Sequence, residues 1–230
     1  MTIPIEIKDL HFRYPKSGKY ILNGIRLEVK RGRILAITGL SGSGKTTLCY
    51  CICGIIPHIY GGEVRGEVLL FGKPVKGMDL PVIATKVGIV FQEPDTQLFS
   101  PTVEDEVAFG PENLCLDRKE IGKRIKSCLE LVGMKKKRYE HPEHLSGGEK
   151  QLVAIASVLA LDPEILILDE AMSEIDYRGR TRIKETILRL RDWGKGIVVV
   201  EHDRENLDIA DSTVELKGGG IFELEAKELG

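Results

Sequence analysis

The sequence lacks an apolar run long enough to cross a membrane. Its longest run, Val153–Leu161, is short and is interrupted by Ser157, whereas a transmembrane helix needs about 20 residues. The N-terminus lacks the charged-then-apolar pattern of a secretory signal peptide. An excess of one charge is also absent, because 33 Lys and Arg face 35 Asp and Glu, for a net charge of −2. Dedicated nucleic-acid binders usually carry a basic excess, so we expect no nucleic-acid partner.

The cysteines do not occur at metal-binding spacings. The chain has five cysteines, an odd number that cannot form a closed disulfide set. Cys49, Cys51 and Cys53 occupy every second position of a short segment, whereas Cys115 and Cys128 are isolated. The paired spacing of a zinc site is therefore missing. This usage favours reduced cysteines in a cytosolic protein.

The composition that is present suits one large α/β domain. The chain has 230 residues, 42% hydrophobic and 30% charged, which is enough to bury a core without disulfides or metals. Apolar segments bounded by turn residues predict strands at Ile3–Arg13, Ile25–Val29, Arg33–Thr38, Glu67–Phe71 and Lys86–Phe91. The Asn23-Gly24 pair predicts a turn before the second strand, and the pattern of Lys45–Ile56 predicts a helix.

The pattern then changes twice. From Thr102 to about Gly148, apolar residues recur at helical spacing, which predicts a helical subdomain. Helices and strands alternate again at Lys150–Leu161, Ile165–Leu168, Arg178–Trp193 and Ile197–Val200. Parallel strands buried on both faces are uninterrupted apolar runs, and ILIL and IVVV are such runs. The predicted fold class is α/β, with a parallel core, an antiparallel N-terminal sheet and an inserted helical subdomain.

A phosphate-binding motif follows the third predicted strand. Residues 39–46, GLSGSGKT, fit G-x-x-x-x-G-K-[ST] at every fixed position. Glycines 39, 42 and 44 let backbone N–H groups turn toward phosphate oxygens, and the following helix adds its positive end. Lys45 is placed to reach the β- and γ-phosphates, and Thr46 to give a hydroxyl to Mg²⁺. The strand before and the helix pattern after the motif argue against a glycine-rich turn without function.

An acidic pair ends the predicted strand ILIL. Asp169 and Glu170 lie at its carboxyl end, where open α/β sheets bind their ligands. Asp169 is predicted to hold Mg²⁺, directly or through water, and Glu170 to act as general base on the attacking water. Alone, such a pair is also an ordinary strand end, but together with the phosphate loop it indicates a nucleotide site.

A third motif, LSGGE at 145–149, opens the predicted helix Lys150–Leu161. Ser146 and Glu149 have the spacing of a capping box, which is a sufficient structural role. Gly147 and Gly148 add more, because they leave bare N–H groups at a helix N-terminus that can hold an anion.

Together these motifs resemble those of ATP-binding-cassette (ABC) ATPases, a class of P-loop NTPases, with Walker A at 39–46, the signature at 145–149 and Walker B at 165–170. The resemblance covers essentially the whole chain. It implies that two such domains clamp two ATP molecules, each γ-phosphate lying between one subunit's P-loop and the other's signature. It also implies one domain over residues 1–230, with the core at 1–92 and 162–230 and the Q-loop and helical subdomain at 93–161.

The resemblance assigns further residues by position. Gln92 resembles the Q-loop glutamine that touches Mg²⁺ and senses the membrane partner, and His202 resembles the switch histidine at the γ-phosphate. Asp176 resembles the D-loop aspartate that couples the two sites. Tyr14 resembles the aromatic residue that stacks on adenine, although Phe12 and Tyr20 are nearby alternatives. The full assignment is Tyr14, Gly39, Leu40, Ser41, Gly42, Ser43, Gly44, Lys45, Thr46 and Thr47 for ATP; Glu170, His202 and Gln92 for catalysis; Thr46, Gln92 and Asp169 for Mg²⁺; Leu145, Ser146, Gly147, Gly148 and Glu149 for the second subunit's ATP; and Asp176 in the D-loop.

The chain departs from the family pattern at two places. The signature ends in Glu149, where the family usually has glutamine. Either residue closes a capping box, but the extra negative charge near phosphate is expected to weaken dimer closure slightly. The D-loop is Ser-Glu-Ile-Asp at 173–176, where a small residue and leucine commonly precede the aspartate. This leaves the communication between the two sites open.

Two longer segments indicate a subgroup. FQEPDTQLF at 91–99 and TVEDEVAFGPEN at 102–113 are similar to the ATPases of energy-coupling-factor importers and their cobalt and nickel relatives. This implies a subunit peripheral to the cytoplasmic face of the cell membrane, paired with a membrane coupling subunit and a membrane substrate-binding subunit, and powering uptake of a vitamin or transition-metal ion. Glu93 and Asp95 are candidates to receive basic side chains of the coupling subunit. Such ATPases often carry an extra C-terminal region; since this chain ends barely past the core, we expect a weak nucleotide-free dimer or one that depends on the membrane subunit.

Other functions remain open at this point. A conventional ABC importer or exporter subunit would share every catalytic residue and differ in its docking loop. A chromosome-maintenance or DNA-repair ATPase would have a long coiled-coil insertion between Walker A and the signature, where this chain has about a hundred residues. A regulatory module without turnover would not need Glu170 and His202.

Overall fold

Two β-sheets frame the chain in the computed structural model, which describes residues 2–224. Sheet A has the strand order β2-β1-β4-β5, and sheet B the order β10-β9-β3-β8-β7-β6. The strands are β1 Ile5–Arg13, β2 Leu22–Val29, β3 Ile34–Thr38, β4 Glu63–Leu70, β5 Lys73–Pro74, β6 Val87–Val90, β7 Ile165–Asp169, β8 Gly196–Val200, β9 Ser212–Lys217 and β10 Gly220–Leu224. The helices are α1 Lys45–Ile52, α2 Ile55–His58, α3 Leu80–Ala84, α4 Val103–Asn113, α5 Arg118–Leu131, α6 Gly147–Leu159 and α7 Tyr177–Asp192.

Sheet B is parallel except at one edge. Strands β6, β7, β8, β3 and β9 pair in parallel, and only β10 runs antiparallel. Sheet A is antiparallel throughout. The predicted α/β class, with its parallel core and antiparallel N-terminal sheet, is confirmed. The parallel register places the carboxyl ends of β3, β8 and β7 side by side, and these are the ends that carry the predicted motifs.

The strands of sheet B are apolar on both faces because both faces are covered. Ile165 and Ile167 pack into a cluster with sheet A and α1, whereas Leu166 and Leu168 pack into a second cluster with α4 to α7. Burial on both sides explains why the run is uninterrupted rather than alternating.

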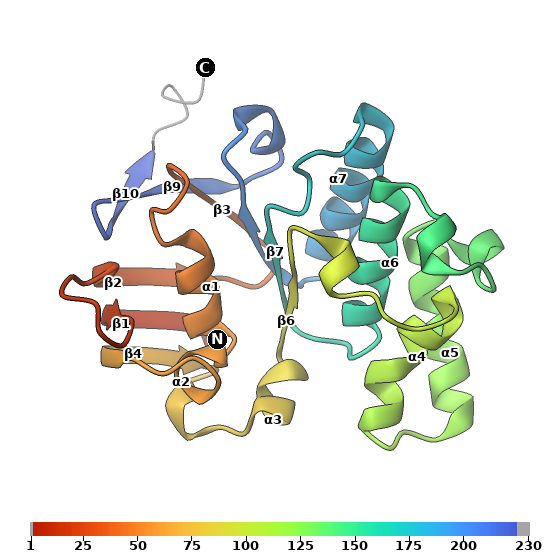
Figure 1. Cartoon of the computed structure of the whole chain (residues 1–230), viewed down its shortest axis with the longest axis horizontal. Helices are drawn as coiled ribbons and strands as arrows, with labels where there is room; N and C mark the ends of the chain where they lie inside the picture. The colour runs from red at the N-terminus through yellow and green to blue at the C-terminus, as the bar shows by residue number, and fades with distance from the viewer. Residues whose placement is uncertain (1, 225–230) are drawn as a thin grey trace.

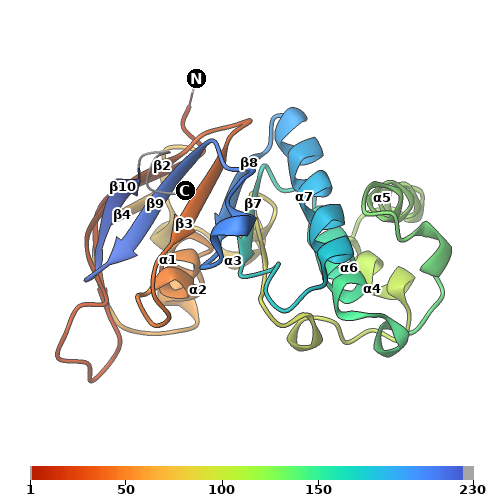
Figure 2. The ribbon, with the colours of Figure 1, turned by 90° about the horizontal axis from the view of Figure 1, so that it is seen from above.

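Helices α4, α5 and α6 form the inserted helical part and lie at the opposite end of the molecule from sheet A (Figures 1 and 2). Helix α7 lies between them and sheet B in Figure 2. Within residues 2–224, none of the helices has the length and apolar character needed to span a bilayer.

Two local predictions are wrong. The helix predicted over Lys45–Ile56 ends at Ile52, because Gly54 adopts φ of 70° and Pro57 restricts Ile56 to an extended conformation (φ −102°, ψ 126°). Asn23 and Gly24 do not form a turn between strands but lie within β2. Gly24 there has φ of 72°, beside the register shifts of the β1–β2 pairing, so this signal marks a bulge.

Candidate functional site

The loop between β3 and α1 has the geometry that a phosphate-binding loop requires. Gly39 has φ of 144°, and a Cβ atom there would lie 2.4 Å from the carbonyl oxygen of Leu216. Gly44, the N-cap of α1, has φ of 107°. Side-chain-bearing residues rarely adopt these conformations. The glycines therefore permit a loop that leads directly into the N-terminus of α1, where free N–H groups favour anions.

Lys45 lies at the centre of the site. Its Nζ donates hydrogen bonds to the carbonyl oxygens of Gly39 and Leu40 at 3.0 and 3.3 Å, and it lies 3.3 Å from Oε1 of Glu170. The other carboxylate oxygen of Glu170, Oε2, lies 3.6 Å from Nδ1 of His202. Residues from three separate motifs thus meet at one point, since they follow the neighbouring strands β3, β7 and β8.

Glu170 is held in an unusual backbone conformation. Its φ is 53°, in the left-handed region that favours glycine. Its N–H donates to the carbonyl oxygen of Val200 at 2.9 Å, which extends the pairing of β7 and β8 by one step. Such conformations cost about 1–3 kcal/mol and persist where the surroundings impose them, often at functional sites.

A cavity of about 720 Å³ opens over these residues. It is lined by Thr38, Gly39, Leu40, Ser41, Lys45, Glu170, His202, Leu207, Glu215 and Leu224. Gln92 and Tyr14 are not part of its lining. Gln92 follows β6, at the same carboxyl edge of the sheet. The Tyr14 hydroxyl lies 3.2 Å from Oγ1 of Thr47, close to the P-loop helix. The roles of both residues therefore stay predictions.

The acidic residue predicted to hold Mg²⁺ has an oxygen without a partner. Asp169 is 5% exposed, and its buried Oδ1 has no hydrogen-bond partner among residues 2–224. Burial raises the pKa of Asp169, while a hydrogen bond from Thr46 opposes that rise. A buried carboxylate oxygen beside a threonine hydroxyl is a donor set that suits Mg²⁺ with substrate phosphates. The residues present fit the ion.

The signature motif lies away from this cavity and has its own geometry. Ser146 Oγ accepts the N–H of Glu149 at 3.4 Å, and Glu149 Oε2 accepts the N–H of Ser146 at 3.0 Å, which completes the predicted capping box at the start of α6. Gly148 packs against Gly179 of α7, where an added Cβ would lie 3.2 Å from the Gly179 Cα.

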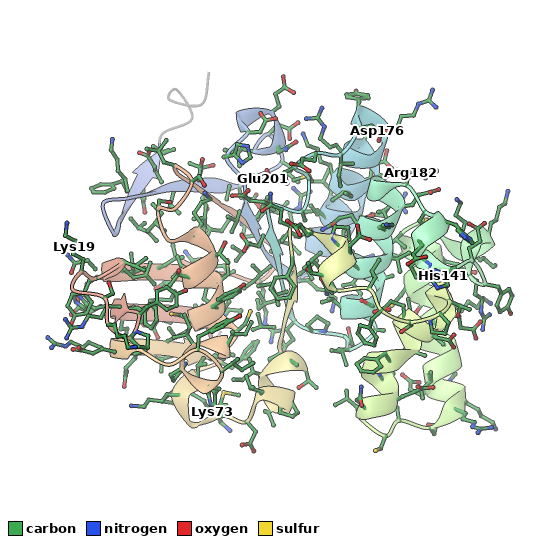
Figure 3. All side chains as sticks on the ribbon, viewed as in Figure 1. Lys19, Lys73, His141, Asp176, Arg182 and Glu201 are labelled. Atoms are coloured by element: carbon green, nitrogen blue, oxygen red, sulfur yellow. The ribbon has the colours of Figure 1, made fainter. Side chains whose placement is uncertain are left out.

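Asp176, predicted as the D-loop aspartate, is the N-cap of α7. Its Oδ1 accepts the N–H of Gly179 at 2.8 Å, and Figure 3 shows it at the upper end of that helix. Since Gly179 also touches Gly148, the D-loop and the signature form one packed unit.

Polar side chains that the sequence reading overlooked hold the Q-loop. Gln151 is fully buried on α6, and its Nε2 donates to the carbonyl oxygen of Phe91 at 2.9 Å. Gln97 Oε1 accepts the N–H of Phe91 at 3.2 Å. At the far end of the loop, buried Glu106 accepts the N–H groups of Phe99 and Ser100 at 3.0 and 2.8 Å. In the sequence, Gln151 is marked only by its place as a polar residue at the start of the apolar run of α6, a position that indicates burial.

The acidic residues of the same loop differ in their partners. Asp95, although its side chain is 71% exposed, lies 2.6 Å from Nζ of Lys150, the residue directly after the signature. Asp95 therefore has a partner inside the chain, which the prediction of a docking role did not foresee. Phe99 and Phe109 are exposed beside the loop and pack edge to face, with centroids 4.7 Å apart.

One further buried acid directly precedes His202 in the chain. Glu201, between β8 and His202, is fully buried, and its Oε1 accepts the N–H of Met172 at 3.0 Å. Burial raises the pKa of Glu201 to about 7. Figure 3 shows it near the middle of the molecule. A charged residue directly after an otherwise apolar strand was the sequence signal that marked it.

Comparison with known proteins gives consistent matches. The family model described as ABC transporter matches residues 22–173. A Methanocaldococcus jannaschii protein named energy-coupling factor transporter ATP-binding protein EcfA is 41% identical over 221 residues, covering 95% of this chain and 77% of that protein. A Carboxydothermus hydrogenoformans protein of the same name is 40% identical over 222 residues, covering 96% and 80%.

A solved structure matches the whole fold. The structure of cbiO1 from Clostridium perfringens, described as part of the ABC transporter complex cbiONQ, has a TM-score of 0.89 and 32% identity and covers 100% of this chain and 91% of that one. Some relatives are much longer: this chain covers only 34% of a Methanosarcina acetivorans protein to which it is 44% identical over 219 residues. These matches confirm the resemblance drawn from the motifs and the subgroup drawn from the Q-loop segment.

Proposed function

The chain belongs to the ABC transporter family, and we propose that it is the ATP-hydrolysing subunit of an energy-coupling-factor importer that takes up a vitamin or a transition-metal ion. The observation that carries the proposal is the meeting of Lys45, Glu170 and His202 at the mouth of one cavity. The names of the M. jannaschii and C. hydrogenoformans relatives and the cbiONQ description of the C. perfringens protein support the subgroup.

The reaction proposed is attack of water on the γ-phosphorus of ATP, which breaks the bond from that phosphorus to the β,γ-bridging oxygen and releases ADP and inorganic phosphate. Glu170 accepts the proton of the water, and Lys45 binds the β- and γ-phosphates in place of its bonds to the Gly39 and Leu40 carbonyl oxygens. His202 donates a hydrogen bond to the γ-phosphate. Asp169 and Thr46 would hold Mg²⁺, which when bound neutralises phosphate charge. Positioning and electrostatic stabilisation supply most of the rate enhancement in such sites.

A second ATPase subunit completes the proposed site. None of the described residues that line the cavity belongs to the signature, so the signature of this chain is free to serve the ATP of a partner. The packing of Gly148 against Gly179 gives a route by which the D-loop and signature respond together. ATP binding is proposed to close the pair, and hydrolysis to reopen it.

The membrane partner is proposed to bind beside the Q-loop. There the exposed pair Phe99 and Phe109 adjoins the acidic residues Glu93 and Asp95, so a helix with apolar and basic side chains would match the surface. A subunit docked in this way is peripheral to the cytoplasmic face of the membrane.

Co-purification tests the proposal directly. The tagged chain is recovered from native membranes in mild detergent and its partners are identified by mass spectrometry. A coupling subunit with a small membrane binding protein is the expected result and reveals the substrate class. Recovery of a conventional permease would be consistent with the ATPase activity but would refute the assignment to the energy-coupling-factor subgroup. Recovery of soluble partners or DNA would refute the role in transport.

Charge reversal tests the docking surface. Glu93→Lys with Asp95→Lys is expected to reduce recovery of the membrane partner. Because Asp95→Lys also breaks the pair with Lys150, a variant that adds Lys150→Asp restores that pair and isolates the docking effect. Glu28→Lys, an exposed reversal on sheet A, serves as the matched control. Unchanged recovery of the membrane partner by the triple variant would show that Glu93 and Asp95 do not contribute to the interface.

A further inference from the structure

The signature of this chain ends in an acid, and that acid is fixed at the helix N-terminus. Glu149 Oε2 accepts hydrogen bonds from the N–H and Oγ of Ser146 at 3.0 and 3.1 Å. The carboxylate therefore cannot swing away from the first turn of α6 without losing the cap. Under the proposed function, this same turn faces the γ-phosphate of the ATP held by the second subunit. An isolated negative charge there would oppose the positive end of the helix.

A lysine neutralises this acid. Nζ of Lys137 lies 3.0 Å from Oε1 and 3.2 Å from Oε2 of Glu149. The contact is the largest cause of the raised pKa of Lys137, and the pKa of Glu149 is lowered by its bonds to Ser146 and by Lys137. Both groups are therefore charged at neutral pH. Lys137 also lies 3.5 Å from Oε2 of Glu140, but both oxygens of Glu149 are nearer, so the lysine charge lies closest to the signature acid.

Lys137 is distinct from the two lysines before it. All three form the 3₁₀ turn η3, Lys135–Lys137, but Lys135 and Lys136 are exposed whereas Lys137 is half-buried. Lys135 pairs instead with Glu130 at 2.7 Å. Of the three lysines in η3, Lys137 therefore contacts the signature acid, whereas Lys135 and Lys136 lie on the surface.

The segment that carries Lys137 is anchored to α4. The guanidinium group of Arg138 donates hydrogen bonds to both carboxylate oxygens of Glu104. The N–H of Glu104 donates to the carbonyl oxygen of Arg138 at 2.8 Å, and the N–H of Val103 donates to that of Glu140 at 3.0 Å. These backbone bonds fix the position from which Lys137 reaches the signature, so the pair does not depend on a freely moving loop.

We propose that Lys137 is a positioning residue that compensates the charge of Glu149, so that this acidic signature can still attract the phosphate of the second subunit's ATP. This inference rests on the proposed function and deepens it. It also replaces the expectation that Glu149 weakens closure, because that expectation treated the acid as unpaired. Removing Lys137 should harm closure only while Glu149 is charged.

A double-mutant cycle tests the dependence. ATP hydrolysis by the full chain is measured as kcat/KM in wild type, Lys137→Met, Glu149→Gln and the double variant. Lys137→Met is expected to lose on the order of tenfold in the wild-type background, because one uncompensated charge then lies near phosphate. In the Glu149→Gln background the same change is expected to cost less than about twofold, since glutamine keeps the cap without the charge.

Lys136→Met is the matched control, because it removes the same charge from the same turn without touching Glu149. It is expected to behave as wild type. The loss in Lys137→Met should also shrink at higher salt, since added ions screen exposed charges.

The outcomes separate the inference from the proposed function. An equal loss for Lys137→Met in both backgrounds would mean that Lys137 is structural or binds phosphate itself, and no loss in either would mean that Glu149 needs no compensation. Either result overturns the inference while the wild type still hydrolyses ATP. A wild type without ATP hydrolysis would overturn the proposed function and the inference together.

Discussion

Replacing Glu201 with glutamine should make the protein more stable at alkaline pH but not at acidic pH. The carboxyl is fully buried and accepts a hydrogen bond from the N–H of Met172. Loss of water around it raises its pKa from 4.5 to about 7, and the negative charge of Glu170 adds to the rise, while the Met172 N–H, Asn206 and His202 oppose it. The neutral form is thus the one that the folded state prefers.

The sign and size follow from proton linkage. A folded-state pKa above the unfolded value gives stability that is present below about pH 4.5 and lost as the pH rises through about 7. Since one pKa unit corresponds to about 1.4 kcal/mol, the loss amounts to about 3 kcal/mol of the free energy of unfolding. Glutamine keeps the acceptor for Met172 and cannot ionise, so it avoids this loss.

The assay is urea unfolding of wild type and Glu201→Gln at pH 5 and pH 8.5. We expect the variant's free energy of unfolding, relative to that of the wild type, to rise by up to about 3 kcal/mol from pH 5 to pH 8.5. Glu215→Gln, which changes a half-buried acid that lines the 720 Å³ cavity, is the control and should show no such gain. A stability difference that is independent of pH would refute the reasoning.

Other changes should affect separate steps. Glu170→Gln is expected to reduce hydrolysis by at least a hundredfold while ATP binding persists, and to trap the closed dimer; turnover at the wild-type rate would show that Glu170 is not the base. Gly39→Ala should abolish ATP binding in equilibrium dialysis, because its Cβ would lie 2.4 Å from the Leu216 carbonyl oxygen; retained affinity would contradict the need for glycine. Gln151→Met should lower stability by about 1–3 kcal/mol in urea unfolding, because the half-buried Phe91 carbonyl oxygen loses its donor; Ser157→Ala on the same helix should change stability much less.

The sequence predicted that three motifs share one edge of the sheet, because each motif follows the end of its own strand. Lys45, Glu170 and His202 are far apart in the chain, but each follows an apolar strand. The parallel order of β3, β8 and β7 brings Glu170 within 3.3 Å of Lys45 and within 3.6 Å of His202. Knowing the strands and their parallel pairing was therefore enough to expect a common edge.

Breaks within elements were harder to predict. The end of α1 depends on Gly54, where an added Cβ would lie 2.5 Å from Cδ1 of Ile83, a contact with a residue far along the chain. Gly24 marks a bulge only because β1 lies beside β2 with shifted register. At Gly24 the sequence signalled a change of direction, and the neighbouring strand made it a bulge and not a turn. At Gly54 the sequence pattern predicted no break, because the contact that ends the helix involves a residue far along the chain.

The charge of a motif residue likewise depends on partners that the motif does not contain. Read alone, Glu149 adds a negative charge at a phosphate site, and Asp95 offers a free carboxylate to a partner. In the folded chain Lys137 reaches the first at 3.0 Å and Lys150 the second at 2.6 Å. Both lysines lie within about a dozen residues of the signature glycines, so the net charge of this surface is set by the segments that flank the motif. It follows that an acidic signature should be judged together with the basic turn that precedes it, and that a charge change in one requires a matching change in the other.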